Sequence, residues 1–202
     1  ADRHSLPPHG MTEANDAYTQ LLGLFSHEYF HAWNVKSIKP AAFAPYDLDR
    51  ENYTEQLWAF EGITSYYDDL FLARSRTIAP EAYLRLLAQS ITRVQQTKGR
   101  LKQSLAESSF TAWNKFYKQD ENSPNAIVSY YQKGALAALC LDLAIRNKSS
   151  GRHTLDSVMQ QHYRDWLDTR QGIPEKQWQA RCQVFTGLDL EDFFPVSYTH
   201  LT

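Results

Sequence analysis

The spacing of apolar residues along this chain is that of α-helices. The clearest stripe follows Pro80, where Leu84, Leu87, Ile91 and Val94 recur at spacings of three and four. Because proline is favoured in the first turn of a helix, this helix is expected to begin at Pro80. The pattern predicts an amphipathic helix with one apolar face.

Further stretches with helical spacing predict five more helices, over residues 13–35, 55–73, 129–147, 154–168 and 174–187. Thr154 can cap the start of one of them, and Gly187 suits the end of another. Residues 104–125 are polar and predict a loop or broken structure, while the strand signals at 110–116 and 126–128 are weak. We therefore predict a mainly α fold, a helical bundle around one core.

Composition and charge narrow the class of protein. Hydrophobic residues make up 43% of the 202 residues, which indicates an ordinary globular domain rather than a disordered chain. The 21 basic and 23 acidic residues nearly balance, so nothing indicates a nucleic-acid or anionic-membrane partner. The longest apolar run, residues 135–141, is too short to be a transmembrane segment.

Two cysteines, Cys140 and Cys182, are too few and too far apart for a cysteine-rich zinc site. We expect both to be buried, reduced thiols, since free cysteine behaves as a small apolar residue. A disulfide between them is the alternative, which sequence alone does not decide.

Residues 27–31 read His-Glu-Tyr-Phe-His, near the middle of the first predicted helix. Four residues of helix advance by about 400°, so His27 and His31 point the same way, one turn apart. Two neutral imidazoles at this spacing can share one metal ion, and Glu28 can then act as general base on a water at the metal. The pattern is therefore typical of a zinc peptidase.

Two other interpretations of this motif were weighed. Histidines on a solvated helix are disfavoured, because apolar residues surround the motif and predict a helix buried nearly all round, in which polar groups need partners. A di-iron bundle would need a second Glu-x-x-His pair, and no glutamate other than Glu28 is followed by histidine three residues later.

Catalytic zinc takes three protein ligands and keeps one open position. Glu61 is the best third candidate, because it is a carboxylate inside the apolar run 57–63, where a buried ion pair is the alternative. Asp68 and Asp69 follow two turns later and can orient a ligand histidine, unless they are solvated helix acids. The remaining histidines are less suitable, with two of them in polar segments that are expected at the surface; they are His4, His9, His153, His162 and His200.

Two adjacent tyrosines, Tyr130 and Tyr131, begin the helix predicted over 129–147. A tyrosine near a zinc site can donate its hydroxyl to the oxyanion that forms during attack on a carbonyl. The alternative is a pair of core aromatic side chains.

Three segments of the chain, residues 27–36, 57–67 and 131–134, together closely resemble the glycyl aminopeptidase family of gluzincins. The resemblance runs in order over about residues 17–194. It implies a thermolysin-like, largely helical catalytic domain that binds Zn²⁺ through His27, His31 and Glu61. It also implies Glu28 as general base and Tyr131 as oxyanion donor, with Tyr130 as the rival.

The resemblance implies a zinc-dependent peptidase that acts on peptide substrates. An aminopeptidase releasing small N-terminal residues is the first expectation, and an endopeptidase is the second. A non-catalytic binding or scaffold protein that keeps the peptidase fold is the alternative from another class.

The chain also departs from the family pattern. Members usually carry an N-terminal β-rich domain, a C-terminal PDZ domain and a Gly-x-x-Glu-His-like segment upstream of the zinc helix. We therefore expect residues 1–195 to be a catalytic domain truncated at both ends, with little turnover in isolation. Residues 196–202 resemble a translated sequencing adapter and are expected to be a non-native tail, which would leave Phe193 and Phe194 in an exposed apolar patch.

Overall fold

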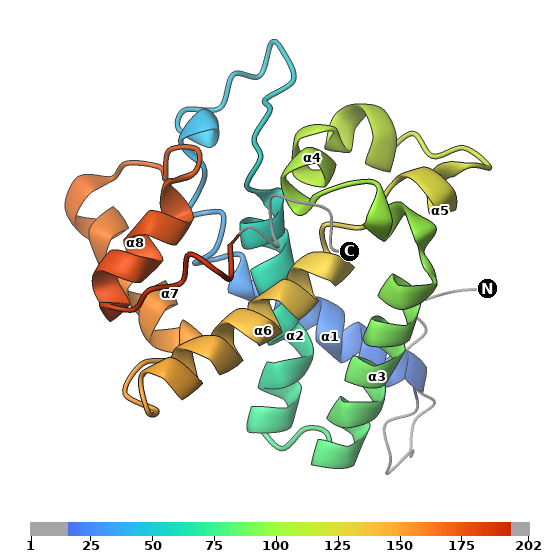
Figure 1. The fold of residues 1–202 in the computed structure, drawn as a ribbon, viewed down its shortest axis with the longest axis horizontal. Coiled ribbons are helices and arrows are strands. Elements are labelled where there is room, and N and C mark those ends of the chain that lie inside the picture. The colour runs from blue at the N-terminus through green and yellow to red at the C-terminus, as the bar shows by residue number, and fades with distance from the viewer. Residues whose placement is uncertain (1–15, 195–202) are drawn as a thin grey trace.

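The computed structural model describes residues 16–194 (Figure 1). Within that range the chain forms helices and no β-strand, and the only sheet-like contacts are isolated bridges between Asn34 and Ile38 and between Pro40 and Ile173. The predicted mainly α class is confirmed. No helix in these residues is both long and apolar enough to cross a membrane.

The six predicted helices are all present, some with shifted ends. They are α1 (Asp16–Phe30), α2 (Ile63–Arg74), α3 (Pro80–Gln96), α6 (Gln132–Lys148), α7 (Leu155–Thr169) and α8 (Gln177–Thr186). Shorter helical turns lie between them: η1 (Ala41–Phe43), η2 (Trp58–Gly62), η3 (Lys98–Leu101), α4 (Leu105–Phe110), η4 (Ala112–Phe116) and α5 (Ser123–Ala126).

Helix α2 is the central element of the bundle. It packs against α1, α3 and α6, and α6 crosses it in Figure 1. Helix α7 packs against α6 and α8 against α7, so these two extend the bundle on one side. On the other side α4 contacts η2, the turn that precedes α2. The segment η2–α2 therefore has helices around it on several sides.

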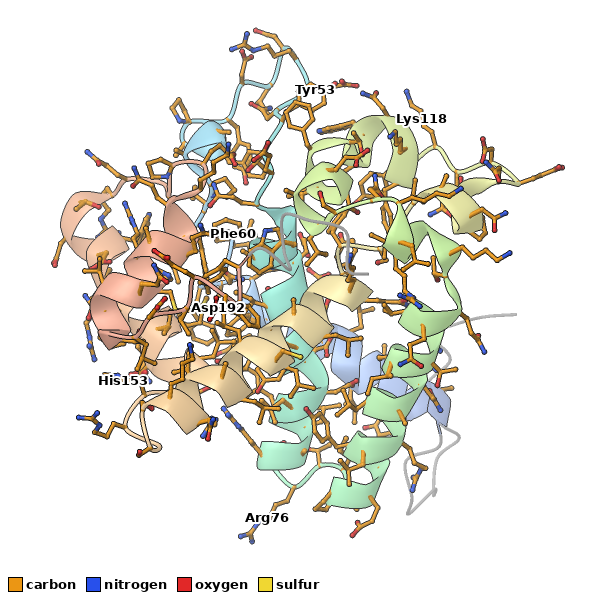
Figure 2. All side chains as sticks on the ribbon, in the orientation of Figure 1. Tyr53, Phe60, Arg76, Lys118, His153 and Asp192 are labelled. Atoms are coloured by element: carbon orange, nitrogen blue, oxygen red, sulfur yellow. The ribbon has the colours of Figure 1, made fainter. Side chains whose placement is uncertain are left out.

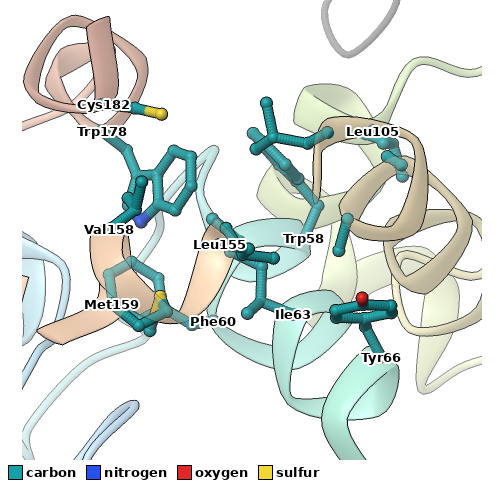
Figure 3. Packing of buried hydrophobic residues seen from close by; sticks show 14 of the residues in the cluster. Trp58, Phe60, Ile63, Tyr66, Leu105, Leu155, Val158, Met159, Trp178 and Cys182 are labelled. Atoms are coloured by element: carbon teal, nitrogen blue, oxygen red, sulfur yellow. The ribbon is translucent and has the colours of Figure 1, made fainter. Parts of the chain in front are cut away.

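The core forms where η2 and α2 meet α7 and α8 (Figure 3). Trp58, Phe60 and Ile63 are almost fully buried there, together with Leu155 and Trp178. Full burial of a large apolar side chain stabilises the fold by about 1.5–3 kcal/mol. In Figure 2 Phe60 accordingly lies in the middle of the molecule, whereas Arg76 and Lys118 lie at its edge.

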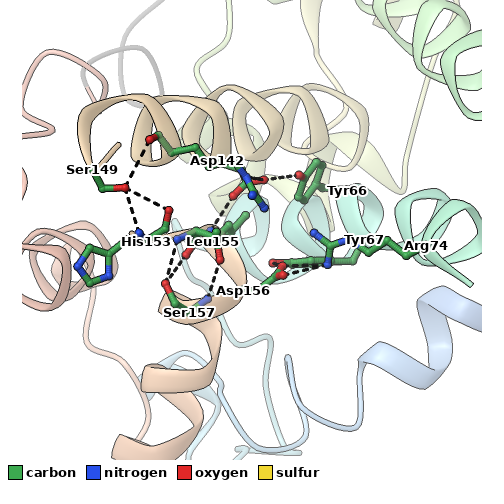
Figure 4. Close-up of polar contacts among 11 residues, drawn as sticks. Tyr66, Tyr67, Arg74, Asp142, Ser149, His153, Leu155, Asp156 and Ser157 are labelled. Atoms are coloured by element: carbon green, nitrogen blue, oxygen red, sulfur yellow. Dashed lines mark hydrogen bonds and ion pairs between the residues drawn. The ribbon is translucent and has the colours of Figure 1, made fainter. Parts of the chain in front are cut away.

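A buried carboxylate ties three helices together (Figure 4). Asp142 of α6 accepts hydrogen bonds from the Tyr66 hydroxyl of α2 at 2.8 Å and from the Leu155 amide of α7 at 2.7 Å. Arg146 of α6 also donates to it at 2.9 Å. With three donors, this buried charge is well compensated, and it fixes the start of α7 against α2.

Helix starts were predicted well where a local cap sets them. Helix α3 begins at Pro80, as predicted. Thr154 caps α7 in a capping box with Ser157, in which each side chain accepts from the other's backbone amide. Gly187 ends α8 with φ 65°, but that helix begins at Gln177 rather than at 174.

The first helix ends earlier than predicted, at Phe30 instead of residue 35. The chain turns back after it: the Asn34 amide donates to the Phe30 carbonyl oxygen at 3.0 Å, and Lys36 donates to His31 at 3.0 Å. Val35 has φ 125°, which is incompatible with helix. The predicted start, at residue 13, lies outside the described residues.

The predicted burial of this helix on all sides is wrong. Leu21 and Phe30 are buried, but Leu24, Phe25 and Tyr29 are 39%, 58% and 71% exposed. Apolar spacing shows which side chains are apolar, but it does not show whether another element covers them. One face of α1 packs on α2, and the opposite face is open.

Several smaller predictions are also corrected by the structure. The weak strand signals at 110–116 and 126–128 are wrong, because the polar stretch is broken into short helical turns. Cys140 is exposed, while Cys182 is buried as predicted, and both are free thiols. Phe194 is buried and packs in the core, so the expected exposed patch is absent there. The proposed tail at 196–202, His4, His9 and His200 lie outside the described residues.

Candidate metal centre

Three of the predicted side chains converge at one point between α1 and η2. The Nε2 atoms of His27 and His31 lie 3.3 and 3.2 Å from Oε2 of Glu61. One ligand atom from each residue lies within 4.8 Å of the others, the only such group found among residues 16–194. Two imidazoles and a carboxylate at this spacing match the donor set of a catalytic zinc site with one open position.

Both imidazoles are held with Nε2 toward Glu61. Nδ1 of His31 lies 2.8 Å from the Asn34 carbonyl oxygen, which can only accept, so the proton of a neutral ring belongs on Nδ1. Nδ1 of His27 lies 3.5 Å from Oδ2 of Asp68. Each ring therefore has its outer nitrogen occupied and turns its inner nitrogen toward Glu61, so that a metal ion replacing the inner proton would find the orientation that metal-binding histidines require.

The charges of this group depend on one another. Burial alone would lower the pKa of His27, but hydrogen bonds to Asp68 and Glu61 raise it to about 9. Burial would raise the pKa of Glu61, but hydrogen bonds from the two histidines lower it to about 2. Burial raises the pKa of Asp68, opposed by its bond to His27. The anionic carboxylates that favour imidazolium here would equally favour a bound cation.

Glu61 lies in a π-helical turn, which the sequence did not predict. In such a turn the backbone hydrogen bonds are shifted from their α-helical partners. The side-chain amide of Asn34 donates to carbonyl groups within this turn. Nδ2 of Asn34 lies 2.8 Å from the Phe60 carbonyl oxygen and 3.3 Å from that of Ala59. Asn34 is fully buried, so it connects the segment after His31 directly to the turn that carries Glu61.

The helix with the two tyrosines approaches the same turn through a pair of glycines. A Cβ atom on Gly62 would lie 2.6 Å from Cα of Gly134, and one on Gly134 would lie 2.9 Å from Cα of Gly62. Both distances are too short for any side chain. The two glycines therefore let η2 and α6 meet backbone to backbone, which brings Tyr131 beside Glu61.

The structure separates the roles of the two tyrosines. Tyr130 is 1% exposed, whereas Tyr131 is half-buried and its ring lies 6.2 Å from the ring of His27. Burial and the negative charge of Glu61 raise the pKa of Tyr131, so its hydroxyl keeps its proton at neutral pH. Tyr131 is therefore better placed than Tyr130 to donate to a group bound beside the histidines.

A cleft of about 890 Å³ opens on one side of the ligand group, and His27, Glu28, Asp68, Asp69 and Tyr131 line it. Glu28 is exposed there, next to His27 on α1. Asp69 is half-buried in the same wall, and burial together with the charge of Asp68 raises its pKa to about 7.

A second hollow of about 460 Å³ is lined in part by Glu61, Trp113, Tyr117 and Tyr130. Members of the ligand group thus line two concave surfaces, His27 the first and Glu61 the second, and the second has aromatic walls.

The two histidines that were expected at the surface are both less exposed than predicted. His153 is half-buried against Phe185, with ring centroids 5.4 Å apart. His162 is 2% exposed and packs against Trp178 at 5.2 Å, so its predicted surface position is wrong. Its neighbours along α7 are polar, which misled the interpretation. Neither histidine belongs to the ligand group.

Three side chains around the site were given no role from the sequence. Asn34 and Tyr117 contact the ligand turn and the tyrosines, respectively. Lys133 is buried, and its Nζ atom lies 3.4 Å from the carbonyl oxygens of Arg100 and Gln103. The sequence signal that could have found such residues is a polar side chain in an apolar segment. This signal is strong for Asn34 and Lys133 but absent for Tyr117.

The family model of the M61 glycyl aminopeptidase matches residues 20–137. Among solved structures, the crystal structure of an aminopeptidase N family protein from Idiomarina loihiensis is 45% identical with a TM-score of 0.92, covering 96% of this chain and 33% of that chain. The chain thus spans about a third of the length of that protein. A search of curated proteins gave no match.

Proposed function

The chain belongs to the M61 glycyl aminopeptidase family, and we propose that it carries the zinc-dependent catalytic centre of an aminopeptidase that releases small N-terminal residues. The observation that carries this proposal is the convergence of His27, His31 and Glu61, with each histidine oriented by a partner outside the group. The family supports a peptidase, and the donor set supports zinc.

The residues present fit a zinc ion by their chemistry. Two imidazole nitrogens and one carboxylate oxygen are a known ligand set of catalytic zinc in peptidases. When bound, zinc would lower the pKa of a water and polarise the substrate carbonyl group. The acidic neighbour Asp68 would hold His27 in the required tautomer, as an outer carboxylate does in other zinc sites.

Glu28 is proposed as the general base. It follows His27 on α1 and lines the same cleft, so its carboxylate faces the space where a water would attack the carbonyl carbon. Glu28 accepts the proton of that water and then passes it to the leaving amine, which must be protonated to depart. The Tyr131 hydroxyl donates a hydrogen bond to the oxyanion that develops on the substrate.

The proposed preference for an N-terminal residue rests on the family and is supported by the charge of the cleft wall. A free α-amino group carries a positive charge, and the cleft wall contains the carboxylates of Asp68, Asp69 and Glu28. These acids favour a cationic substrate end on this side. An aminopeptidase should cleave glycyl or alanyl peptides and should not cleave the same peptides after N-acetylation, whereas an endopeptidase would accept both.

Zinc content and turnover of three variants test this proposal. The purified protein should hold about one zinc ion per chain, and Glu61→Ala should lose most of it, because two histidines alone bind weakly. In a complete enzyme, Glu28→Gln should keep the zinc and lose turnover by about 10²–10⁴-fold, because an amide cannot accept the proton. Metal is measured by mass spectrometry and turnover with glycyl and alanyl amides.

His153→Ala and Glu81→Gln are the matched controls, since both residues lie outside the ligand group and the cleft lining. Both controls should match the parent protein in zinc content and in turnover. Full zinc retention by Glu61→Ala would overturn the ligand assignment. Near-normal turnover by Glu28→Gln would overturn the mechanism, and zinc binding by a complete enzyme without any peptidase activity would favour a binding or scaffold protein.

A further inference from the structure

Three tyrosine hydroxyls meet beside the candidate metal centre. The hydroxyl oxygen of Tyr117 lies 3.1 Å from that of Tyr130 and 3.2 Å from that of Tyr131. Tyr117 comes from the segment after η4, and the other two precede α6, so the contact joins separate elements. Tyr131 is the proposed oxyanion donor, and the Tyr117 hydroxyl is thus a direct neighbour of the donor group.

Tyr117 is held in this position although it is 63% exposed. Its amide donates to the Ala112 carbonyl oxygen at 3.1 Å, which closes η4. The ring of Phe116 packs against the rings of Tyr130 and Tyr131, with centroids 4.9 and 5.8 Å away. The aromatic contacts therefore fix the end of η4 on the tyrosine pair, which leaves the Tyr117 hydroxyl pointing at both partners.

The number of hydrogen bonds that a phenol can donate and accept determines which hydroxyl donates to which. A tyrosine hydroxyl donates one hydrogen bond and can accept others. If Tyr131 donates its proton to a substrate oxyanion, it has none left for Tyr117, so Tyr117 must donate to Tyr131. Tyr130, buried and within 3.1 Å, can then donate to Tyr117. The three hydroxyls form a chain that runs from the core to the site.

We propose that Tyr117 is a positioning residue for the oxyanion donor: its hydroxyl, supported by Tyr130, donates to the Tyr131 oxygen and directs the Tyr131 proton into the cleft. The inference rests on the proposed peptidase function. A hydrogen bond received by a donor strengthens the bond that the donor makes, so Tyr117 acts through Tyr131 and does not touch the substrate oxyanion itself.

This role predicts a specific pattern of kinetic effects. Tyr131→Phe removes the oxyanion donor and should lower kcat by about 10²-fold or more. Tyr117→Phe removes one supporting hydrogen bond and should lower kcat by about 3- to 10-fold with KM unchanged. In the Tyr131→Phe background, Tyr117→Phe should change kcat by less than about 2-fold, because its target hydroxyl is gone.

Tyr53→Phe is the matched control, because the Tyr53 hydroxyl contacts Glu51 and Asn114 instead of the tyrosine pair. It should leave kcat unchanged. Equal losses of kcat from Tyr117→Phe in both backgrounds, or a loss confined to KM, would overturn the proposal. No loss in Tyr117→Phe together with a large loss in Tyr131→Phe would overturn it as well.

A measurement that needs no turnover separates this inference from the proposed function. In protein labelled with ¹³C at the tyrosine Cζ atom, Tyr117→Phe should shift the resonances of Tyr130 and Tyr131, because Cζ responds to hydrogen bonding of the hydroxyl. Tyr53→Phe should shift neither. If these shifts are absent, the hydroxyl chain is wrong whatever the protein catalyses. If they are present in a protein without peptidase activity, the proposed function fails and the role of Tyr117 in catalysis fails with it.

Discussion

At the scale of single residues, the partners of the ligands decide what the ligands can bind. His27 and His31 could face any direction that their helix allows, but Asp68 and the Asn34 carbonyl group occupy their outer nitrogens. The inner nitrogens are then turned toward the Glu61 carboxylate. Asn34 has a second task, because its side chain donates to the carbonyl groups of the turn that carries Glu61.

Replacement of Asn34 tests this second task. Asn34→Ala keeps the backbone carbonyl group that orients His31 and removes only the amide, so the Phe60 carbonyl oxygen loses a 2.8 Å donor in a buried place. We expect the free energy of unfolding to fall by about 1–3 kcal/mol. Zinc affinity should weaken by about 10–100-fold, as for other outer partners of ligands. Thermal unfolding and competition with a zinc-binding dye measure the two effects.

Asn147→Ala serves as the control for this experiment, since Asn147 is an exposed asparagine near the end of α6. It should change neither quantity. If Asn34→Ala binds zinc as tightly as the parent protein, the π-helical turn holds Glu61 in place without help from Asn34. The proposed role of the Asn34 side chain in the metal site would then be wrong.

The role of a residue in the site could be predicted from the sequence where its side chain differs in polarity from its neighbours along the chain. Glu61 was found as a carboxylate inside an apolar run, and the structure places it beside both histidines. Tyr117 could not be found in this way. A tyrosine in a polar stretch has no conflict to reveal it, and its partners lie 13 and 14 residues away across two turns.

At the scale of elements, the site depends on how η2 and α6 cross. Each glycine of the pair Gly62 and Gly134 occupies the space that a Cβ atom on the other would need. The crossing also brings the Tyr130 carbonyl oxygen to 3.0 Å from the position of a Cβ atom on Gly62. The turn with Glu61 and the start of the helix with Tyr131 are thus fixed relative to each other by backbone contact.

We expect Gly134→Ala to disturb the site and the fold together. The new methyl group would lie 2.9 Å from Cα of Gly62 and 3.0 Å from the Trp58 carbonyl oxygen, and neither backbone atom can rotate away. Overpacking of this kind costs about 1–3 kcal/mol of stability. Helix propensity alone would predict a gain of about 1 kcal/mol, so the sign of the change decides between the two effects. Urea unfolding gives the sign.

Cys140→Ala introduces the same residue at an exposed position of the same helix and should leave stability nearly unchanged. A stability gain in Gly134→Ala would show that α6 can move away from η2. In that case Tyr131 would not be fixed beside Glu61 by the crossing.

Helix boundaries could be predicted where local capping sets them and not where tertiary contacts do. The start of α7 follows from Thr154 and Ser157, three residues apart, which sequence shows directly. The end of α1 follows from a turn whose Asn34 side chain is drawn to Phe60, 26 residues away. The π-helical turn at Glu61 has the same origin, since apolar spacing does not distinguish it from the α-helix that was predicted there.

At the scale of the whole molecule, the packing of α7 and α8 is remote from the proposed centre but sets the response of the fold to pH. His162 of α7 is buried against Trp178 of α8. Within residues 16–194 neither of its ring nitrogens has a hydrogen-bond partner. Among the charged groups around it, Arg181 opposes protonation and Asp165 favours it.

Burial, with the charge of Arg181, lowers the pKa of His162 from 6.5 to about 4. The folded protein therefore keeps this ring neutral between pH 6.5 and 4, while the unfolded chain takes up a proton. The contribution of His162 to stability must therefore fall as pH falls through this window, by up to roughly 3 kcal/mol, and this group adds no further loss below about pH 4.

The ligand group acts in other pH ranges, so the effect of His162 can be isolated in metal-free protein. The raised pKa of His27, about 9, stabilises the fold at low pH and loses its effect as pH rises from 6.5 to 9. The lowered pKa of Glu61, about 2, contributes above pH 4.5 and loses its effect as pH falls toward 2. Neither window overlaps much with the range from 4 to 6.5. The raised pKa of Asp69, about 7, does act there, because its contribution to stability is lost as pH rises from 3.8 to 7, opposite in sign to that of His162. Asp69 is present in both proteins, so the difference between the parent and a His162 variant isolates His162.

His162→Leu should therefore remove the loss of stability that His162 causes as pH falls from 6.5 to 4. Leucine fills a similar space without a proton to take up, and it removes two buried ring nitrogens that lack partners. The free energy of unfolding, measured with urea at half-unit pH steps in metal-free protein, should fall less steeply than in the parent by up to roughly 3 kcal/mol over the window. His153→Leu, at a half-buried histidine against α8, is the control for loss of any histidine. Parallel curves for the parent and His162→Leu would mean that His162 is protonated in the folded protein, so that the tight contact between α7 and α8 opens before pH 4.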